Sequence, residues 1–282
     1  MIRLLPIALL MFSLNGISQE AMNAMTFNIR YSTSSDGINQ WDNRKDFVAQ
    51  TVLFHDADLC GMQEALYSQI IDLEKRLPEY GWVGVGRDDG DKKGELSPVF
   101  YLKKRFDLVE TNTFWLNEHP EKLGYGWDAR LNRIVTWAKL RDKTTGQEVI
   151  IFNTHFDHKG EIARRESAKL VLRKVKEIAK DTPFLVTGDF NASPAQEPIQ
   201  ILTDESEAFY FVSSEKLSKT PHFGPRGTFT GFQEKERDNE PIDYIFVAEK
   251  GVEVSKHATL SNTWGGLFAS DHFAVMATLR FY

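Results

Sequence analysis

The chain has 282 residues, and 34 lysine and arginine residues against 40 aspartate and glutamate residues give it a formal net charge of −6. Its 26% charged and 12% aromatic residues exclude a disordered or collagen-like chain. The single cysteine, Cys60, excludes an intrachain disulfide and a zinc site built from several thiolates, while the acidic balance argues against holding nucleic acid by bulk charge.

The first eighteen residues are typical of a secretory signal peptide. Arg3 supplies a positive charge, residues 4–14 form an apolar run, and small residues precede a cleavage site after Ser18. The run is too short to span a membrane comfortably. The alternative is a buried first strand or helix. We therefore expect residues 1–18 to be removed and the mature chain to be exported, with no membrane span after processing.

Segments typical of strands and helices alternate along the rest of the chain, without internal repeats. Apolar alternation or a short apolar run predicts a strand, and apolar residues at helical spacing predict a helix. In chain order these patterns predict a strand over 24–31, a helix over 44–55, a strand over 58–63, a helix over 66–77, strands over 80–85, 98–102, 106–113, 134–140 and 148–153, a helix over 161–180, and strands over 183–188, 242–247 and 273–281. Many hairpin strands with few helices indicate packed sheets with helices outside.

Polar residues stand at the ends of these predicted strands. Burying an acid costs free energy unless it is paired or bound to a metal. One shared site is therefore a simpler explanation than a separate one for each place. The six places are Asn28, Gln63 with Glu64, His155, Asp189 with Asn191, Asp243, and Asp271 with His272.

Oxygen ligands dominate this set. Carboxylate and amide oxygens suit a hard cation such as Mg²⁺, Mn²⁺ or Ca²⁺, whereas zinc is expected to recruit several imidazoles or thiolates. The two histidines can stabilise an anionic oxygen or move a proton near neutral pH. A metal with carboxylates and imidazoles indicates hydrolysis of a phosphate ester, because the metal offsets the negative charge that would repel an attacking water.

Six short blocks resemble, in order, the signature blocks of the endonuclease/exonuclease/phosphatase superfamily, whose fold is typified by pancreatic deoxyribonuclease. The blocks are Thr26-Phe27-Asn28, Met62-Gln63-Glu64, Asn153-Thr154-His155, Gly188-Asp189-Phe190-Asn191, Ile242-Asp243-Tyr244-Ile245 and Ser270-Asp271-His272. One block alone is a weak signal, but six in order are a strong one. The resemblance, to secreted bacterial members in particular, implies a four-layer α/β sandwich of two packed mixed β-sheets flanked by helices. Because the blocks reach both ends, residues 19–282 are expected to form one domain.

The resemblance also implies a metal shell. Glu64 would be the principal ligand, and Asn28 and Asp271 would complete or support the shell. The implied cofactor is Mg²⁺ or Mn²⁺, with Ca²⁺ as an alternative. Gln63 would hold neighbouring groups.

The remaining matched residues have implied catalytic roles. Asp189 and Asn191 would orient and activate the attacking water. His272, held by Asp243, and His155 would contact the phosphate and stabilise its developing charge.

Other positions leave two interpretations open. Tyr101 matches a phosphate-binding tyrosine only loosely and fits equally well as an ordinary strand aromatic. Arg133 either reaches a substrate phosphate or caps a strand edge. Arg44 and Arg164 are expected to be surface charges.

The motifs indicate the chemistry but not the substrate, because the family hydrolyses DNA, RNA, inositol phosphates and phospholipids with nearly the same residues. The loops over 32–41, 87–97, 114–132 and 222–237 should set specificity. Trp115 and Trp127 in the third loop either stack on a sugar or base or pack beneath the loop. No segment clusters lysine and arginine as a committed duplex binder does. We therefore favour a small or medium phosphate ester over duplex DNA.

We expect a secreted or periplasmic, divalent-metal-dependent phosphoesterase that hydrolyses a phosphate mono- or diester by in-line attack of an activated water. Its partner would be the phosphate-ester substrate, including nucleic acid as one alternative, and no protein partner is inferred. The alternatives are a secreted nuclease acting on DNA or RNA, a non-catalytic binding protein on the same fold, and a glycosidase. A binding protein has no need for a water-activating Asp189, and a glycosidase leaves both histidines without roles.

Overall fold

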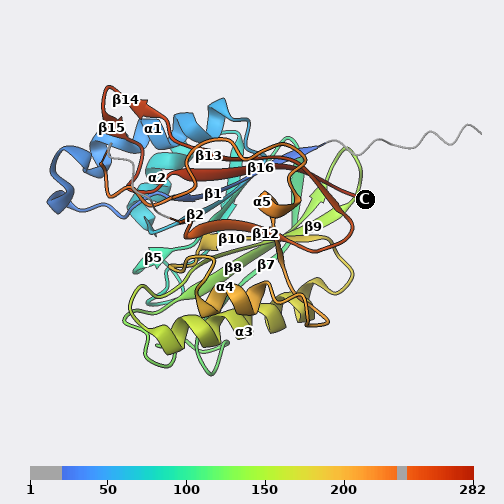
Figure 1. The fold of residues 1–282 in the computed structure, drawn as a ribbon. Coiled ribbons are helices and arrows are strands. Elements are labelled where there is room, and N and C mark those ends of the chain that lie inside the picture. Colours follow the sequence, from blue (N-terminus) through green and yellow to red (C-terminus); the bar gives the residue numbers. More distant parts are fainter. Residues whose placement is uncertain (1–20, 234–239) are drawn as a thin grey trace, which may run out of the picture.

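The computed structural model describes residues 21–233 and 240–282, so the expected signal peptide and part of the expected loop over 222–237 lie outside the described residues. Two six-stranded mixed sheets pack against each other, and helices cover their outer faces (Figure 1). The predicted α/β sandwich is therefore confirmed. Within the described residues, no helix is long and apolar enough to cross a membrane.

The first sheet joins both ends of the described chain. Its strands, in spatial order, are β13 (Val252–Leu260), β16 (Ala274–Phe281), β1 (Met22–Asn28), β2 (Leu59–Gln63), β6 (Val99–Leu102) and β4 (Tyr80–Val83). Helices α1 (Trp41–Phe54) and α2 (Tyr67–Arg76) lie on its outer face (Figure 1). The short helix η1 (Ser34–Asn39) precedes α1.

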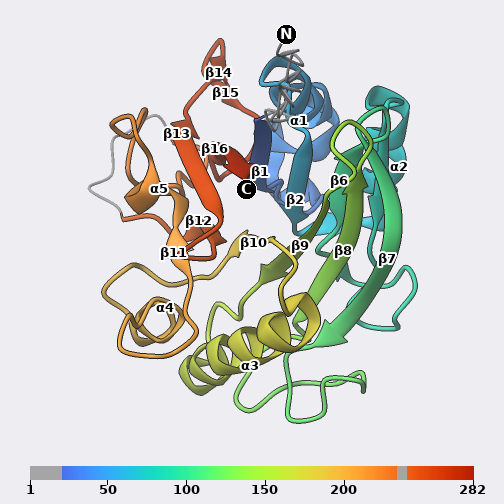
Figure 2. The same ribbon diagram turned by 90° about the vertical axis from the view of Figure 1, so that its right-hand side faces the viewer.

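The second sheet comes from the middle of the chain. Its strands, in spatial order, are β11 (Val212–Ser213), β12 (Asp243–Val247), β10 (Phe184–Asp189), β9 (Glu148–His155), β8 (Ile134–Asp142) and β7 (Phe106–Trp115). Figure 2 shows α3 (Glu161–Ala179) and α4 (Glu197–Leu202) on its outer side. Smaller elements are α5 (Ser214–Leu217) and the strand pairs β3 (Ala65–Leu66) with β5 (Glu95–Leu96) and β14 (Thr263–Trp264) with β15 (Leu267–Phe268).

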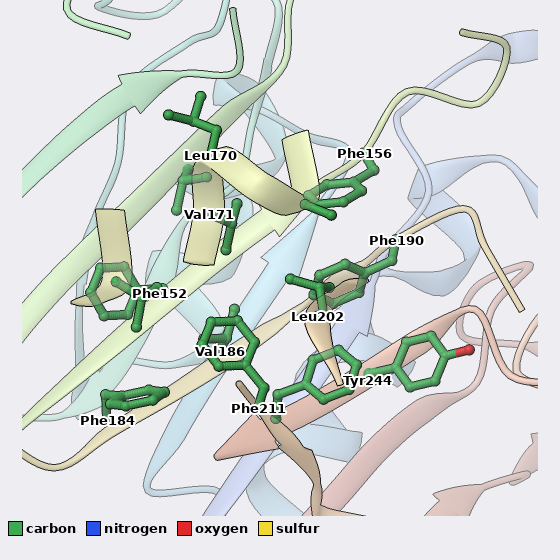
Figure 3. Packing of buried hydrophobic residues seen from close by; sticks show 14 of the residues in the cluster. Phe152, Phe156, Leu170, Val171, Phe184, Val186, Phe190, Leu202, Phe211 and Tyr244 are labelled. Carbon is green, nitrogen blue, oxygen red and sulfur yellow. The ribbon is translucent and has the colours of Figure 1, made fainter. Parts of the chain in front are cut away.

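Three apolar clusters separate the four layers. One cluster lies between the first sheet and α1 and α2, and another lies between the two sheets. The third joins the second sheet to α3 and α4, where Phe152, Val186 and Phe190 pack towards Leu170 and Leu202 (Figure 3). Most strands of the two sheets supply residues to two clusters, because successive side chains of a strand point to opposite faces.

This alternation places the polar residues. In β10, Leu185 packs between the sheets, and the period of two brings Thr187 and Asp189 to the same face. In β9, Ile151 likewise packs between the sheets, and His155 follows on that face at the strand end. The layer between the sheets is therefore apolar along most of its length and polar at one end.

A buried polar layer separates the apolar core from that end. Gln63 Nε2 donates to Thr26 Oγ1 at 3.0 Å and to Asn153 Oδ1 at 2.6 Å. Asn153 Nδ2 donates to the carbonyl oxygens of Met62 and Pro98. Gly61 leaves room for this contact, because a Cβ there would lie 2.1 Å from Thr187 Oγ1. Gln63 therefore holds Thr26 and Asn153 in place beneath the polar end of the sheets, in line with the expectation that it holds neighbouring groups.

The predicted strands and helices all appear, with ends shifted by a few residues, but β13, α4 and the shorter elements were not predicted. A bulge between Val254 and Lys256 shifts the register of β13 against β16. The extra residue interrupts the alternation of inward and outward side chains on which strand prediction depends.

The expectation that Arg44 and Arg164 are surface charges is wrong, since they are 1% and 9% exposed. Arg44 donates to the carbonyl oxygens of Ile29, Arg30 and Ala269, and Arg164 donates to that of Asp157, so both fix loops beside the polar end of the molecule.

Candidate active site

The polar strand ends open into a pocket of about 500 Å³. Seven of the expected site residues line it: Glu64, Arg133, His155, Asp189, Asn191, Asp271 and His272. Asn28 and Asp243 lie directly behind them, hydrogen-bonded to Asp189 and His272 respectively. The parallel pairs β1 with β2 and β9 with β10 bring their carboxyl ends together, which is why residues far apart in sequence meet here.

His272 and Asp243 form a buried ion pair. His272 Nδ1 lies 2.9 Å from Asp243 Oδ2, and its Nε2 lies 3.7 Å from Asp189 Oδ2. Burial alone would lower the pKa of His272, but the carboxylates of Asp243, Asp189 and Asp271 hold it well above the usual value. The raised pKa favours the protonated form of His272, which is able to face an anionic oxygen.

Asp189 is the carboxylate at the centre of the site. Burial and the nearby Asp243 carboxylate raise its pKa to about 7, although His272 and hydrogen bonds from Asn191 and Asn28 oppose that rise. The Asn191 backbone N–H donates to Oδ1 and the Asn28 amide donates to Oδ2, both at 2.9 Å. An oriented carboxylate with a pKa near neutrality is suited to accept a proton from water.

His155 has the opposite charge state to His272. The Asn191 amide nitrogen donates to His155 Nε2 at 3.0 Å and to the Phe156 carbonyl oxygen, so Nε2 is an acceptor and Nδ1 carries the proton. Burial and the guanidinium groups of Arg133 and Arg87 lower the pKa of His155 well below its usual value. The neutral ring presents Nδ1–H to Glu95 Oε2 at 3.9 Å.

Two site residues adopt left-handed backbone conformations. Glu64 has φ 59° and Asn191 has φ 47°. Asparagine tolerates this region, but for glutamate it costs free energy that the surrounding structure must offset. The strained turn after β2 aims the Glu64 carboxylate into the pocket rather than back onto the sheet.

The Glu64 and Asp271 carboxylates are suited to hold a hard divalent cation. Different nitrogens of the Arg30 guanidinium lie 3.8 Å from each carboxylate, so the two acids lie on either side of the same side chain at the pocket. Burial and the Glu64 carboxylate raise the pKa of Asp271, while His272 and Arg30 oppose that rise. Two nearby carboxylates repel each other, and a bound cation would relieve that repulsion. Because they offer only oxygen ligands, Mg²⁺, Mn²⁺ or Ca²⁺ would suit them.

Asn28 is placed to support this pair rather than to bind a cation. Its amide nitrogen donates to Glu64 Oε1 at 3.2 Å, and its Oδ1 accepts from the Arg30 backbone N–H at 3.0 Å. The oxygen that a metal would need is therefore turned away from the Glu64 carboxylate. A second group of close ligand atoms, from Asp189, Asp243 and His272, contains an imidazolium already paired with Asp243, which suits proton chemistry better than metal binding.

Tyr101 is not brought into the site. It pairs with Leu59 at the first residue of β2, whereas the site lies beyond Gln63 at the other end. At about 3.3 Å per residue this separates Tyr101 from Glu64 by roughly 16 Å. Its ring packs against Gly81. The interpretation as a strand aromatic is the one that the structure supports, and the phosphate-binding interpretation is wrong on this placement.

The tryptophans of the loop over 114–132 are also occupied elsewhere. Trp115 Nε1 donates to the Arg87 carbonyl oxygen at 2.9 Å, and Trp127 packs against the cluster beneath α3. Pocket residues that the sequence analysis missed include Arg30, Glu95 and His158. His158 follows His155 by three residues, which was a usable signal, but Glu95 and Arg30 belong to no recognisable pattern.

Comparison with known proteins places these observations in a wider context. A model described as the endonuclease/exonuclease/phosphatase family matches residues 25–272. The structure of an endonuclease/exonuclease/phosphatase from Bacteroides vulgatus is 42% identical, covers 94% of this chain and 100% of that chain, and has a TM-score of 0.89. The structure of a mannosyl-6-phosphatase from Bacteroides thetaiotaomicron is 36% identical in sequence, covers 92% of this chain and 100% of that chain, and has a TM-score of 0.88. Nocturnin from Drosophila melanogaster is 23% identical over 84% of this chain, which corresponds to 41% of that longer protein.

Proposed function

The chain belongs to the endonuclease/exonuclease/phosphatase family, as its six blocks predicted, and we propose that it hydrolyses a phosphate ester with a divalent metal ion and an activated water. The observation that carries the proposal is that the carboxylates of Glu64, Asp189 and Asp271 share one pocket with two imidazoles, His272 and His155, whose pKa values are shifted in opposite directions. A binding protein or a glycosidase would use only part of this set.

In this proposal Glu64 and Asp271 hold Mg²⁺ or Mn²⁺, or alternatively Ca²⁺, and Asn28 supports the Glu64 carboxylate. The bound cation would neutralise negative charge on the phosphate and lower the pKa of a nearby water. These roles match the oxygen-only character of the two ligands.

The protein's own groups supply the remaining chemistry. Asp189 and Asn191 orient the water for in-line attack, and Asp189 accepts its proton. The His272 imidazolium, fixed by Asp243, faces the phosphate oxygens and stabilises their developing charge. His155 and Arg133 bind further phosphate oxygens from the other side of the pocket, where Arg133 Nη1 is buried without a hydrogen-bond partner among the described residues.

We favour a phosphate monoester as substrate because one similar structure is that of a mannosyl-6-phosphatase. The second candidate is nucleic acid, since the family also includes endonucleases and exonucleases. We further propose that residues 19–282 act as one domain after residues 1–18 are removed on export. The mass of the protein recovered from the periplasm or medium of a bacterial host tests the cleavage.

The direct test is hydrolysis of p-nitrophenyl phosphate, bis-(p-nitrophenyl) phosphate, plasmid DNA and single-stranded RNA with Mg²⁺ or Mn²⁺, and again after chelation by EDTA. We expect activity on at least one ester that EDTA abolishes. Asp189→Ala should lower kcat by about 10³-fold or more, as removal of a catalytic group does elsewhere. The matched control is Asp107→Ala, because Asp107 is an exposed aspartate on β7. Full activity in Asp189→Ala with unchanged thermal unfolding would refute the proposal.

A further inference from the structure

One wall of the pocket contains groups that the proposed chemistry does not fully use. Glu95, Arg133 and His158 line it, with Arg87 directly behind Glu95. We call these four residues the Arg133 wall. None of them lies in the six motif blocks.

Arg133 organises the wall through its separate nitrogens. Its Nε donates to Asp157 Oδ2 at 3.4 Å, and its Nη2 donates to His158 Nδ1 at 3.1 Å. Asp157 is itself held by the backbone N–H groups of Lys159 and Gly160. Arg133 is therefore fixed on two sides, and its Nη1 is buried without a hydrogen-bond partner among the described residues.

The contact with Arg133 determines what His158 can do. A guanidinium only donates hydrogen bonds, so His158 Nδ1 must be an acceptor and the ring proton must lie on Nε2. Burial and the charge of Arg133 also lower the pKa of His158. His158 is therefore a neutral ring whose Nε2–H is a donor on the edge turned away from Arg133.

Glu95 supplies the complementary acceptor. Both of its carboxylate oxygens accept from Arg87, at 2.6 and 2.9 Å, which fixes the orientation of the group. Each oxygen keeps a further lone pair. The side chain is 15% exposed and lines the pocket, so these lone pairs are accessible to a ligand.

Apolar side chains complete the same pocket. Leu131, Phe229 and Ile242 line it, and its volume of about 500 Å³ lies within the range of sites that enclose small organic ligands, about 300–1,000 Å³. The pocket thus combines a fixed donor, a fixed acceptor and apolar surface beside the phosphate site.

We propose that Glu95 and His158 bind hydroxyl groups of the substrate's leaving group, and that the preferred substrate is a phosphate monoester of a sugar or another polyol. A hydroxyl both donates and accepts, so neighbouring hydroxyls can satisfy the Glu95 oxygens and His158 Nε2–H together. A second phosphate would be repelled by Glu95, and an aryl group would offer no partner to His158 Nε2–H or to the remaining lone pairs of Glu95. This inference rests on the proposed phosphoesterase function.

The test compares a hexose 6-phosphate with p-nitrophenyl phosphate, which has no leaving-group hydroxyls, in the full chain with Mg²⁺. In His158→Ala, KM for the hexose phosphate should rise about tenfold, the loss of one hydrogen bond of about 1.4 kcal/mol. KM for p-nitrophenyl phosphate should change much less, because that substrate loses only the contact that positions Arg133. His158→Gln, whose amide can replace the Nε2–H donor, should recover most of the loss. The neighbouring Lys159→Ala is the matched control and should behave as the unaltered chain does.

Two outcomes would overturn this inference alone. One is an equal change for both substrates, or no change, in His158→Ala. The other is an unaltered chain that hydrolyses p-nitrophenyl phosphate at least as well as hexose, glycerol or other polyol phosphates. If the unaltered chain hydrolyses no phosphate ester with any of the metals, the proposed function itself fails.

Discussion

The two buried histidines of the site differ in charge although they are equally enclosed. His272 is 5% exposed and His155 is 7% exposed. Burial lowers the pKa of both rings, but the Asp243 carboxylate more than offsets this effect at His272, whereas Arg133 and Arg87 add to it at His155. At equal burial, the charged partner therefore determines in which direction the pKa of each imidazole shifts.

Because of this difference in charge, we expect the two sides of the pocket to have different chemical roles. The side of His272 carries a positive ring next to three carboxylates, which suits charge stabilisation and proton transfer. The side of His155 carries a neutral ring in a network of fixed donors and acceptors, which suits recognition. Both histidines lie next to the same carboxylate: Asp189 Oδ2 is 3.7 Å from His272 Nε2 and 3.6 Å from His155 Nε2.

The largest expected effect comes from removing the carboxylate that distinguishes His272. Asp243→Asn should lower kcat by about 10²–10³-fold, because the imidazolium loses both its counterion and its orientation. The pKa of His272, followed by NMR titration, should fall in the same variant. Loss of activity with an unchanged pKa of His272 would contradict the comparison, and unchanged thermal unfolding excludes a folding defect.

A smaller effect is expected on the other side. Arg133→Gln removes a positive charge near His155 and His158, so the pKa of both rings should rise, with the sign opposite to that in Asp243→Asn. KM for phosphate monoesters should increase about tenfold because a charged phosphate contact is lost. Histidine NMR and steady-state kinetics measure the two effects. Unchanged pKa values would show that burial alone keeps these rings neutral.

A third effect is on stability rather than on activity, and it concerns a buried histidine that lies next to another histidine. His257 on β13 lies with its Nδ1 2.8 Å from His222 Nδ1, and burial together with His222 lowers its pKa to about 3. Because the folded-state value lies below the unfolded value of about 6.5, its contribution to stability is complete above pH 6.5 and is lost as the pH falls towards 3.

Denaturant unfolding at pH 7 and pH 5 tests this. The unaltered chain should lose about 2 kcal/mol more between the two pH values than His257→Asn, since every other titrating group is common to both. The asparagine amide can still donate towards His222. An identical loss in both proteins would mean that His257 does not titrate with folding.

The site residues that could be predicted from the sequence were those that lie in short local patterns. Asn28, Glu64, Asp189 and His272 could be named because each ends or begins an apolar run within a short block. The family and the sandwich fold followed from the order of these blocks, and both are confirmed. Tyr101 was the residue whose block matched loosely, and it lies at the wrong end of its neighbouring strand.

The unpredicted part depends on pairings between distant segments. Glu95 faces His155 only because β5 pairs with β3 after Glu64. His158 has a defined tautomer only because Arg133, which precedes β8, donates to it. Arg44 seemed a surface charge because its buried partners are backbone carbonyls, which no side-chain pattern records.

The sequence by itself determined which residues end the strands and hence the acids, amides and imidazoles of the site, since the alternation of a strand assigns each side chain to a face. Only the tertiary structure decided which histidine is charged and which way the Asn28 amide turns. Those properties depend on burial and on partners within about 4 Å, and these partners come from segments that meet only when the two sheets pack together.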